Sequence, residues 1–258
     1  MVRSPQTAET RGWGIPDQHT LTGHTHAPQG QEFTMAKKPT ETIEIKPPNF
    51  RTLEVGIIGT APLVLNKFSH KAKMMMKAKQ EAGGQAKKKK EREAKDFEAC
   101  YEAAKYVSRD GTVASKAPRM ASDDPWLGVP APAFRNAMIS ACRLVGFTMT
   151  IAKLAVFVEA DGFDRDDGTP LVKITKGEPH YHESMVRNET GVCDIRARPM
   201  WDEWEIVLRV RFDADMFSEA DVVNLLARAG AQVGIGEGRP GSKNSNGMGW
   251  GTYRLAER

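Results

Sequence analysis

The chain has 258 residues, of which 40% are hydrophobic and 27% are charged, which is typical of a soluble globular protein with one large domain or two small ones. It has no run of 18 apolar residues, so the sequence excludes a membrane-spanning helix. The three cysteines are far apart and odd in number, which argues against a disulfide framework or a zinc knuckle and indicates a reducing, cytoplasmic location.

The net charge is +4, but charge is distributed unevenly along the chain. Residues 67–95, named here the basic arm, carry eleven Lys or Arg and three Glu, so the rest of the chain is mildly acidic. This distribution is expected when the partner is a polyanion, and the alternative is a solvated, lysine-rich helical hairpin. The cations expected to contact a nucleic acid from this arm are Lys67, Lys71, Lys73, Lys77, Lys87, Lys88, Lys89 and Lys90.

Residues 1–34 are polar, lack periodicity and lack the apolar segment of a signal peptide. We expect a disordered leader, or a start site that is assigned too early, because Met35-Ala-Lys-Lys-Pro resembles an ordinary cytoplasmic start. Residues 35–258 are then expected to form a single domain.

Hydrophobic periodicity predicts the elements of this domain in chain order. A first strand precedes the arm, the arm contains two helices, and strands and helices alternate after it. The expected core elements are strand 53–60, helix 131–145, strand 154–160, strand 203–212, helix 218–230 and strand 250–256. The expected helices of the arm are 69–82 and 91–107, and short strand-like pieces are expected at 171–175 and 192–197.

The core elements follow each other as βαββαβ, the order of the ferredoxin-like split βαβ motif. The expected fold is therefore α+β, with a four-stranded antiparallel sheet, both helices on one face and an open face like that of RNA-recognition domains. Segments 61–129, which include the basic arm, and 161–200 are insertions into this core.

Seven of the 23 glycines lie between Gly234 and Gly251, in a segment named here the glycine loop. Such a loop either stays mobile or orders against a ligand that needs bare backbone nearby. It matches neither a P-loop nor a dinucleotide-binding fingerprint and it follows a helix, so a mononucleotide site is not expected. We expect contacts with a nucleic-acid backbone from Gly236, Gly238, Arg239 and Lys243, and the alternative is a flexible surface loop.

Basic residues alternate with aromatic ones in the second insertion. Arg187, Arg196 and Arg198 could line a groove with Tyr181 and Trp201, because bases stack on rings while guanidinium groups hold phosphates. Trp201 could equally cover the sheet.

Three histidines carry groups that could act in catalysis or bind a metal. His180 and His182 would share one face of a strand, but without a clear third ligand, for which Asp194 is the only candidate, we expect no metal. His70 in the basic arm could act as an acid or base in RNA cleavage, although one histidine among lysines is weak support, so no catalytic residue and no cofactor are assigned.

A glycine-rich loop between the last helix and last strand of a ferredoxin-like core resembles the RAMP superfamily, the repeat-associated RNA-binding proteins that include the Cas7-type backbone subunits of CRISPR effector complexes. The resemblance is carried by Gly234-Ile-Gly-Glu-Gly-Arg-Pro-Gly and Gly247-Met-Gly-Trp-Gly, and by the helical insertion after the first strand. The lysine-rich arm and the tryptophan–glycine end also resemble those of phage and prophage proteins.

The leading hypothesis is therefore a non-enzymatic protein that binds single-stranded RNA or DNA along its backbone, as a homo-oligomer or a subunit of a nucleoprotein complex. One alternative is a phage structural or assembly protein whose arm and loop contact neighbouring subunits. A second alternative, implied by the resemblance, is a RAMP-type endoribonuclease.

Overall fold

The computed structural model describes residues 45–68, 70–81, 94–109, 125–187, 193–243 and 247–257. The chain divides into two units, Met1–Ile45 and Lys46–Arg258, and the fold described below belongs to the second. The described residues form an α+β structure with five α-helices and two antiparallel sheets. The predicted leader, residues 1–34, lies outside the described residues.

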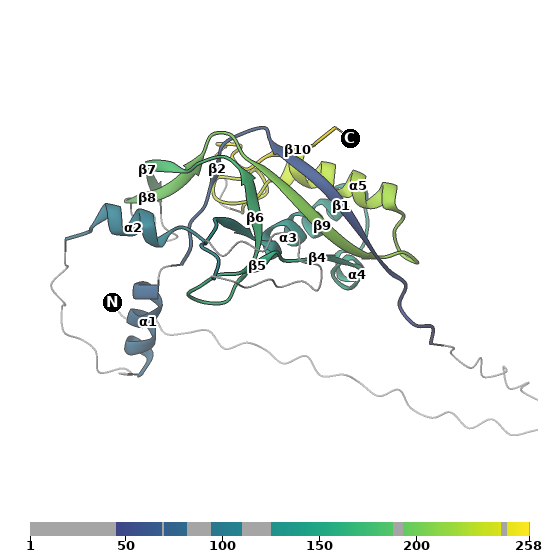
Figure 1. Cartoon of the computed structure of the whole chain (residues 1–258), viewed down its shortest axis with the longest axis horizontal. Helices are drawn as coiled ribbons and strands as arrows, with labels where there is room; N and C mark the ends of the chain where they lie inside the picture. The colour runs from purple at the N-terminus through teal and green to yellow at the C-terminus, as the bar shows by residue number, and fades with distance from the viewer. Residues whose placement is uncertain are drawn as a thin grey trace, which may run out of the picture. The chain divides into compact units, whose positions relative to one another are not determined.

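The main sheet is organised around β1 (Phe50–Gly59) and β9 (Glu205–Asp213), which pair antiparallel over nearly their whole length. Leu53 lies opposite Val210, so the apolar side chains of both strands share one face. The strand order is β10–β1–β9–β6–β3, and β4 also pairs with β9 (Figure 1). The other strands of this sheet are β3 (Gly128–Pro130), β4 (Val156–Val158), β5 (Gly162–Phe163), β6 (Pro170–Lys176) and β10 (Tyr253–Leu255).

Two helices, α3 (Ala131–Ala141) and α5 (Glu219–Arg228), contact each other and pack against the apolar face of this sheet. Their apolar side chains recur at helical spacing, so each helix buries one stripe. The helical residues most deeply buried in this core are Phe134, Met138, Val222 and Leu226.

The helix expected over 131–145 is shorter than predicted. The α-helix ends at Ala141 and tightens into a 3₁₀ turn, η2 (Cys142–Val145), which Gly146 closes with a left-handed φ of 69°. Leu144 and Val145 are about half exposed, so packing does not hold these residues in a continued helix.

The strand expected over 154–160 is also shorter. A helix, α4 (Met149–Ala155), buries Ala152 and Ala155, and only β4 remains as strand. The alanines, Met149 and Lys153 favour a helix, and that local preference takes the first residues of the predicted strand.

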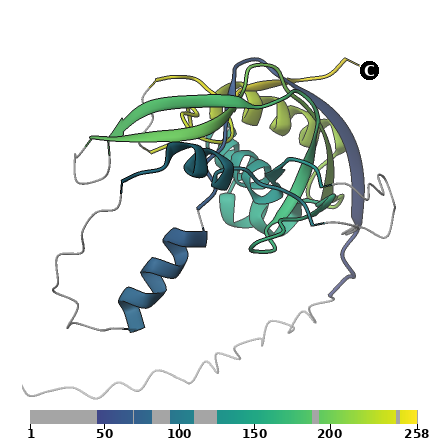
Figure 2. The same ribbon diagram turned by 60° about the vertical axis from the view of Figure 1, so that its left-hand side comes forward.

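The insertion after β4 is more regular than the sequence indicates. Its first two strands, β5 and β6, join the main sheet, and the rest forms an antiparallel hairpin of β7 (His180–Arg187) and β8 (Cys193–Trp201). The two-residue strand β2 (Leu63–Val64) pairs with β8 and completes a second, three-stranded sheet. Figure 2 shows this long ribbon with α2 (Phe97–Ala103) alongside it.

The basic arm contains α1 (His70–Glu81), close to the expected helix 69–82. The second expected helix, 91–107, is represented by the shorter α2, which begins after the N-cap Asp96. Residues 82–93 and 110–124 lie outside the described residues. Among the helices that the structure describes, each is too short or too polar to cross a bilayer.

Candidate nucleic-acid interface

The glycine loop leaves a π-helical turn, η3 (Ala229–Val233), at the end of α5 and leads into β10. The Ile235 N–H donates a 3.0 Å hydrogen bond to the carbonyl oxygen of Gly251, which ties the two ends of the loop together. The Glu237 N–H donates to the carbonyl oxygen of Val64 at 2.9 Å, which ties the loop to β2. The described part of the loop is therefore held by backbone hydrogen bonds rather than left free.

Two of the glycines singled out in the sequence are required by this packing. Gly236 has a φ of +71°, and a Cβ there would lie 2.5 Å from the Val64 carbonyl oxygen. A Cβ at Gly238 would lie 2.6 Å from the ring of Trp250. The glycines thus allow the loop to close on β2 and on its own tryptophan.

An ion pair joins the glycine loop to the β7–β8 hairpin. The buried guanidinium of Arg198 donates from Nη1 to the Glu237 carboxylate at 3.0 Å, and from Nη2 to the Ser184 hydroxyl. The Asn66 amide donates to the other Glu237 oxygen at 3.4 Å. Burial lowers the pKa of Arg198, but a guanidinium remains charged near neutral pH, so the pair persists there.

A ring contact joins the same two segments. The imidazole of His182 lies edge-on to the indole of Trp250, with ring centroids 5.5 Å apart. Burial, then Arg198 and His180, lower the pKa of His182, against a smaller opposing effect of Asp202. His182 is therefore neutral at neutral pH and offers no positive charge to a phosphate.

The structure gathers no metal site around the histidine pair. His180 lies 3.5 Å from an Asp202 carboxylate oxygen, whereas Asp194 lies further along the hairpin, opposite Val186, and accepts a hydrogen bond from Lys95. In the part of the chain that the structure describes, no three His, Cys, Asp or Glu side chains are placed to hold a metal ion.

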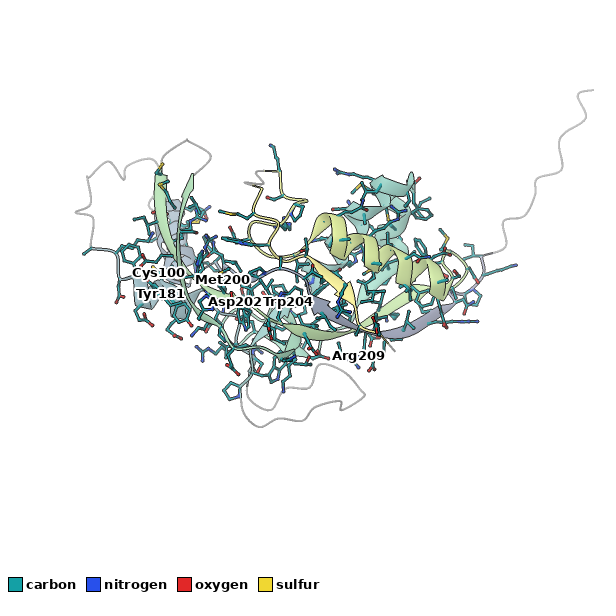
Figure 3. The ribbon with its side chains drawn as sticks, turned by 90° about the horizontal axis from the view of Figure 1, so that it is seen from above. Cys100, Tyr181, Met200, Asp202, Trp204 and Arg209 are labelled. Carbon is teal, nitrogen blue, oxygen red and sulfur yellow. The ribbon has the colours of Figure 1, made fainter. Side chains whose placement is uncertain are left out.

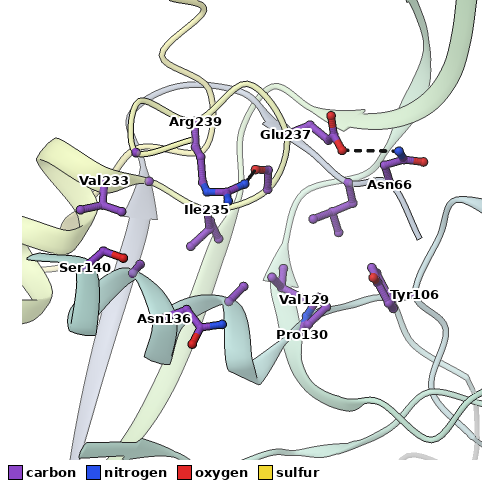
Figure 4. A pocket seen from close by; sticks show the side chains of 16 residues that line it. Asn66, Tyr106, Val129, Pro130, Asn136, Ser140, Val233, Ile235, Glu237 and Arg239 are labelled. Atoms are coloured by element: carbon purple, nitrogen blue, oxygen red, sulfur yellow. Dashed lines mark hydrogen bonds between the residues drawn. The ribbon is translucent and has the colours of Figure 1, made fainter. Parts of the chain in front are cut away.

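A pocket of about 280 Å³ lies between the glycine loop and one side of α3 (Figure 4). Its walls are formed by apolar side chains, and polar groups from four segments surround them. The apolar residues are Leu65, Val129, Pro130, Ala133, Ala137, Val233 and Ile235. The polar residues are Asn66, Tyr106, Asn136, Ser140, Glu237 and Arg239.

Lys67, a predicted phosphate ligand, is instead buried. Its ammonium donates to the carboxylates of Asp164 and Asp166, each at 2.6 Å, and it is only 5% exposed. Burial opposes the charge of Lys67, but the two carboxylates outweigh it, so the pKa of Lys67 is raised. This lysine therefore has a structural role in the described fold.

The other predicted cations of the basic arm are placed only in part. Lys73 and Lys77 are exposed on α1, and the Lys77 ammonium lies 3.8 Å from Glu81. Lys71 is on the same helix, whereas Lys87, Lys88, Lys89 and Lys90 lie outside the described residues.

The predicted cations of the hairpin and loop differ in exposure. Arg196 is half-buried and lies 3.6 Å from Asp194, and the backbone of Arg187 pairs with Cys193 near the end of the hairpin. Lys243 is exposed in the glycine loop. The Arg239 guanidinium folds back and donates to the carbonyl oxygen of Gly236 at 2.7 Å.

The two aromatic residues proposed for a groove differ in exposure. Trp201 is fully buried in the core, so it covers the sheet and cannot stack on a base. Tyr181 is 39% exposed, and its ring lies 5.4 Å from that of Tyr101 on α2. Figure 3 places Tyr181 at the hairpin end of the second unit, away from Arg209 of the main sheet.

The sequence reasoning missed the polar side of α3. Asn136 and Ser140 are four residues apart in a helix whose only other polar residue is Arg135, so they lie on one helical face. That spacing is a signal that the sequence offered. Asn66 carried no such signal, because only the fold brings it near Glu237.

A scan against protein-family models finds no match for this chain, and a comparison with curated proteins finds no relative in sequence.

Proposed function

We propose that the chain is a non-enzymatic protein that binds single-stranded nucleic acid along its sugar–phosphate backbone. The observation that carries this proposal is the joining of the glycine loop to the β7–β8 hairpin, through the Arg198–Glu237 ion pair and the His182–Trp250 ring contact. Two segments that the sequence singled out for nucleic-acid contact are thereby held together, beside the pocket that Glu237 lines.

We further propose that the core is ferredoxin-like and related to the RAMP superfamily. Three observations support this relation. β9 lies between β1 and β4, and β10 pairs with the outer side of β1, which gives the order β10–β1–β9–β4. In this order α3 precedes β4 and α5 precedes β10, as in a split βαβ motif. The glycine loop lies between the last helix and the last strand.

The basic arm supplies the electrostatic part of the proposal. Residues 67–95 carry a balance of +8, and Lys73 and Lys77 expose their ammonium groups on α1. Such charges attract phosphates regardless of base sequence, and their binding releases counterions. Binding is therefore expected to be largely independent of sequence and to weaken steeply with salt.

The proposal is tested by electrophoretic mobility shift with single-stranded RNA and single-stranded DNA at low salt. Replacing Lys87, Lys88, Lys89 and Lys90 by Gln is expected to lower the affinity about tenfold or more, because four phosphate contacts are lost. The matched control replaces four exposed cations elsewhere, Lys46, Arg51, Lys153 and Lys176, by Gln. Equal losses in the two variants would contradict a role for the arm, and no shift with either strand would refute the proposal.

One observation favours the assembly alternative. Leu154 on α4 is 75% exposed and Leu144 is 51% exposed, and Val145, the residue after Leu144, lines a second cavity of about 320 Å³ together with Met216. Exposed apolar side chains of this size are typical of contact surfaces. Light scattering with and without nuclease separates the two functions: oligomers that persist after nuclease treatment and carry no nucleic acid would favour assembly.

A further inference from the structure

The pocket between the glycine loop and α3 is poorly suited to a phosphate. Arg239 is the one cation among its described lining residues, and its guanidinium already donates to the carbonyl oxygen of Gly236. Glu237 brings a carboxylate to the same pocket, and because this carboxylate pairs with Arg198, the pair offers no free cation to an anion. The N-terminus of α3 offers little compensation, because Pro132 lacks one of the first-turn N–H donors.

The same pocket suits a flat, uncharged ring. Val129, Ala133, Ala137 and Ile235 provide apolar walls, and glycine backbone forms one side, where a ligand can approach closely. Its volume of about 280 Å³ lies near the lower end of the range for small-molecule sites, which is roughly 300–1,000 Å³. The space fits a single heterocycle rather than an extended ligand.

Polar groups are available to read the edge of such a ring. The Asn136 amide and the Ser140 hydroxyl line the pocket, and among the described residues neither side chain has a hydrogen-bond partner. Tyr106 also lines it, and burial together with Asp167 and Asp164 raises the pKa of its hydroxyl. Tyr106 therefore keeps its proton and remains a donor.

We propose that this pocket receives a nucleobase that leaves the stack of the bound strand, while phosphates are held by the basic arm. This inference rests on the proposed function, since it requires a bound strand. It assigns the glycine loop to base recognition rather than to phosphate binding. An amide, a hydroxyl and a phenol around apolar walls are groups that hydrogen-bond base edges and exclude water from ring faces.

The first test compares two single strands of equal length and equal phosphate number, one with bases and one abasic. Fluorescence anisotropy with the full chain is expected to give an affinity at least about tenfold higher for the strand with bases. Equal affinities would overturn the base-pocket inference while leaving backbone binding intact. Binding of neither strand at low salt would refute the proposed function and the inference with it.

The second test assigns the base preference to the pocket. Asn136→Leu fills the pocket from an exposed position of α3, and Asn224→Leu makes the same change at an exposed position of α5, outside this pocket. Asn136→Leu is expected to abolish the difference in affinity between the strand with bases and the abasic strand, and Asn224→Leu is expected to preserve it. The inference fails if Asn136→Leu also preserves it.

A spectroscopic signal makes the second test independent of affinity. A strand carrying 2-aminopurine becomes brighter when that base leaves the stack. Binding of the unmodified chain is expected to raise the fluorescence, and Asn136→Leu is expected to bind without that rise. A rise in Asn136→Leu as large as that in the unmodified chain would show that the base unstacks elsewhere and would overturn the inference.

Discussion

Gly251 and Gly247 lie in the same loop and share a positive φ, of 67° and 77°, but their surroundings differ. A Cβ at Gly251 would overlap the carbonyl oxygen of Ile235. The carbonyl oxygen of Gly251 also accepts a hydrogen bond from the Ile235 N–H. A Cβ at Gly247 would meet no atom within 4 Å. A substitution at Gly247 therefore tests the cost of backbone strain alone, and a substitution at Gly251 tests that cost together with a steric overlap.

Gly247→Ala is expected to lower the free energy of unfolding by about 1 kcal/mol, the cost of a left-handed conformation for alanine. Gly251→Ala adds a backbone overlap and is expected to lower it by about 3 kcal/mol or more. Urea denaturation of the two variants measures both effects. Equal losses would show that the closed form of the loop is not the stable one.

His182 gives the fold a pH dependence of predictable sign. Burial, then the neighbours Arg198 and His180, place the folded pKa of His182 below its unfolded value of about 6.5. The folded state then binds fewer protons, so the contribution of neutral His182 is present above about pH 6.5 and is lost as the pH falls below it.

His182→Gln is therefore expected to make unfolding less dependent on pH between about pH 7.5 and about pH 5.5. The difference in slope between the two proteins is at most about 1.4 kcal/mol per pH unit, the limit for one proton. Denaturation midpoints across this range provide the measurement. An unchanged slope would mean that the imidazole is as well solvated in the fold as in the unfolded chain.

At the scale of elements, the root of the basic arm is a buried junction of three segments. Lys67 lies where the arm leaves the core, and its N–H donates to the carbonyl oxygen of Ala104, where α2 ends. Its ammonium holds Asp164 and Asp166, and the Asp164 carboxylate also accepts from the N–H of Val107. The charge run alone could not distinguish this lysine from its exposed neighbours.

Lys67→Met is expected to destabilise the fold by about 3–5 kcal/mol, because it leaves the buried Asp164 carboxylate without its cation. Lys77→Met is the matched control, since its exposed pair with Glu81 contributes at most about 0.5 kcal/mol. Chemical denaturation of both variants decides between a structural and a surface role. Similar small losses of unfolding free energy in the two variants would show that Lys67 behaves as a surface cation.

The elements with strong local signals could be predicted from the sequence. Strand β9 alternates apolar and polar residues, and α5 begins at a capping box in which Ser218 and Asp221 bond each other's backbone N–H. The β7–β8 hairpin was largely missed, because residues such as Tyr181, Glu183 and Met185 are exposed and lack the apolar alternation of a half-buried strand.

The pocket could not be predicted, for a different reason. Its polar residues come from positions as distant as Asn66, Tyr106, Asn136 and Glu237, and only tertiary packing brings them together. The same holds for Arg198. The sequence marks it as a cation for nucleic-acid contact, but its burial against Glu237 depends on how the glycine loop closes. Local patterns report on single elements, whereas this site is built between them.

At the scale of the whole molecule, our proposal gives two parts of the protein to one bound strand. The basic arm, with a charge balance of +8, is proposed to attract the phosphates, and the pocket beside the glycine loop is proposed to receive a base. The affinity that the basic arm contributes is expected to fall with salt, because phosphate contacts release counterions. The affinity that the pocket contributes is expected not to depend on salt, because a base contact releases none.

The central claim, binding of single-stranded nucleic acid, is tested most directly by a salt titration of the affinity. Anisotropy of a labelled single strand, measured with the full chain from about 50 mM to about 200 mM salt, is expected to give a slope of log K against log salt steeper than about −3. A duplex of the same length is expected to bind more weakly, because its bases are not available to the pocket. No binding at the lowest salt, or an affinity independent of salt, would contradict the account.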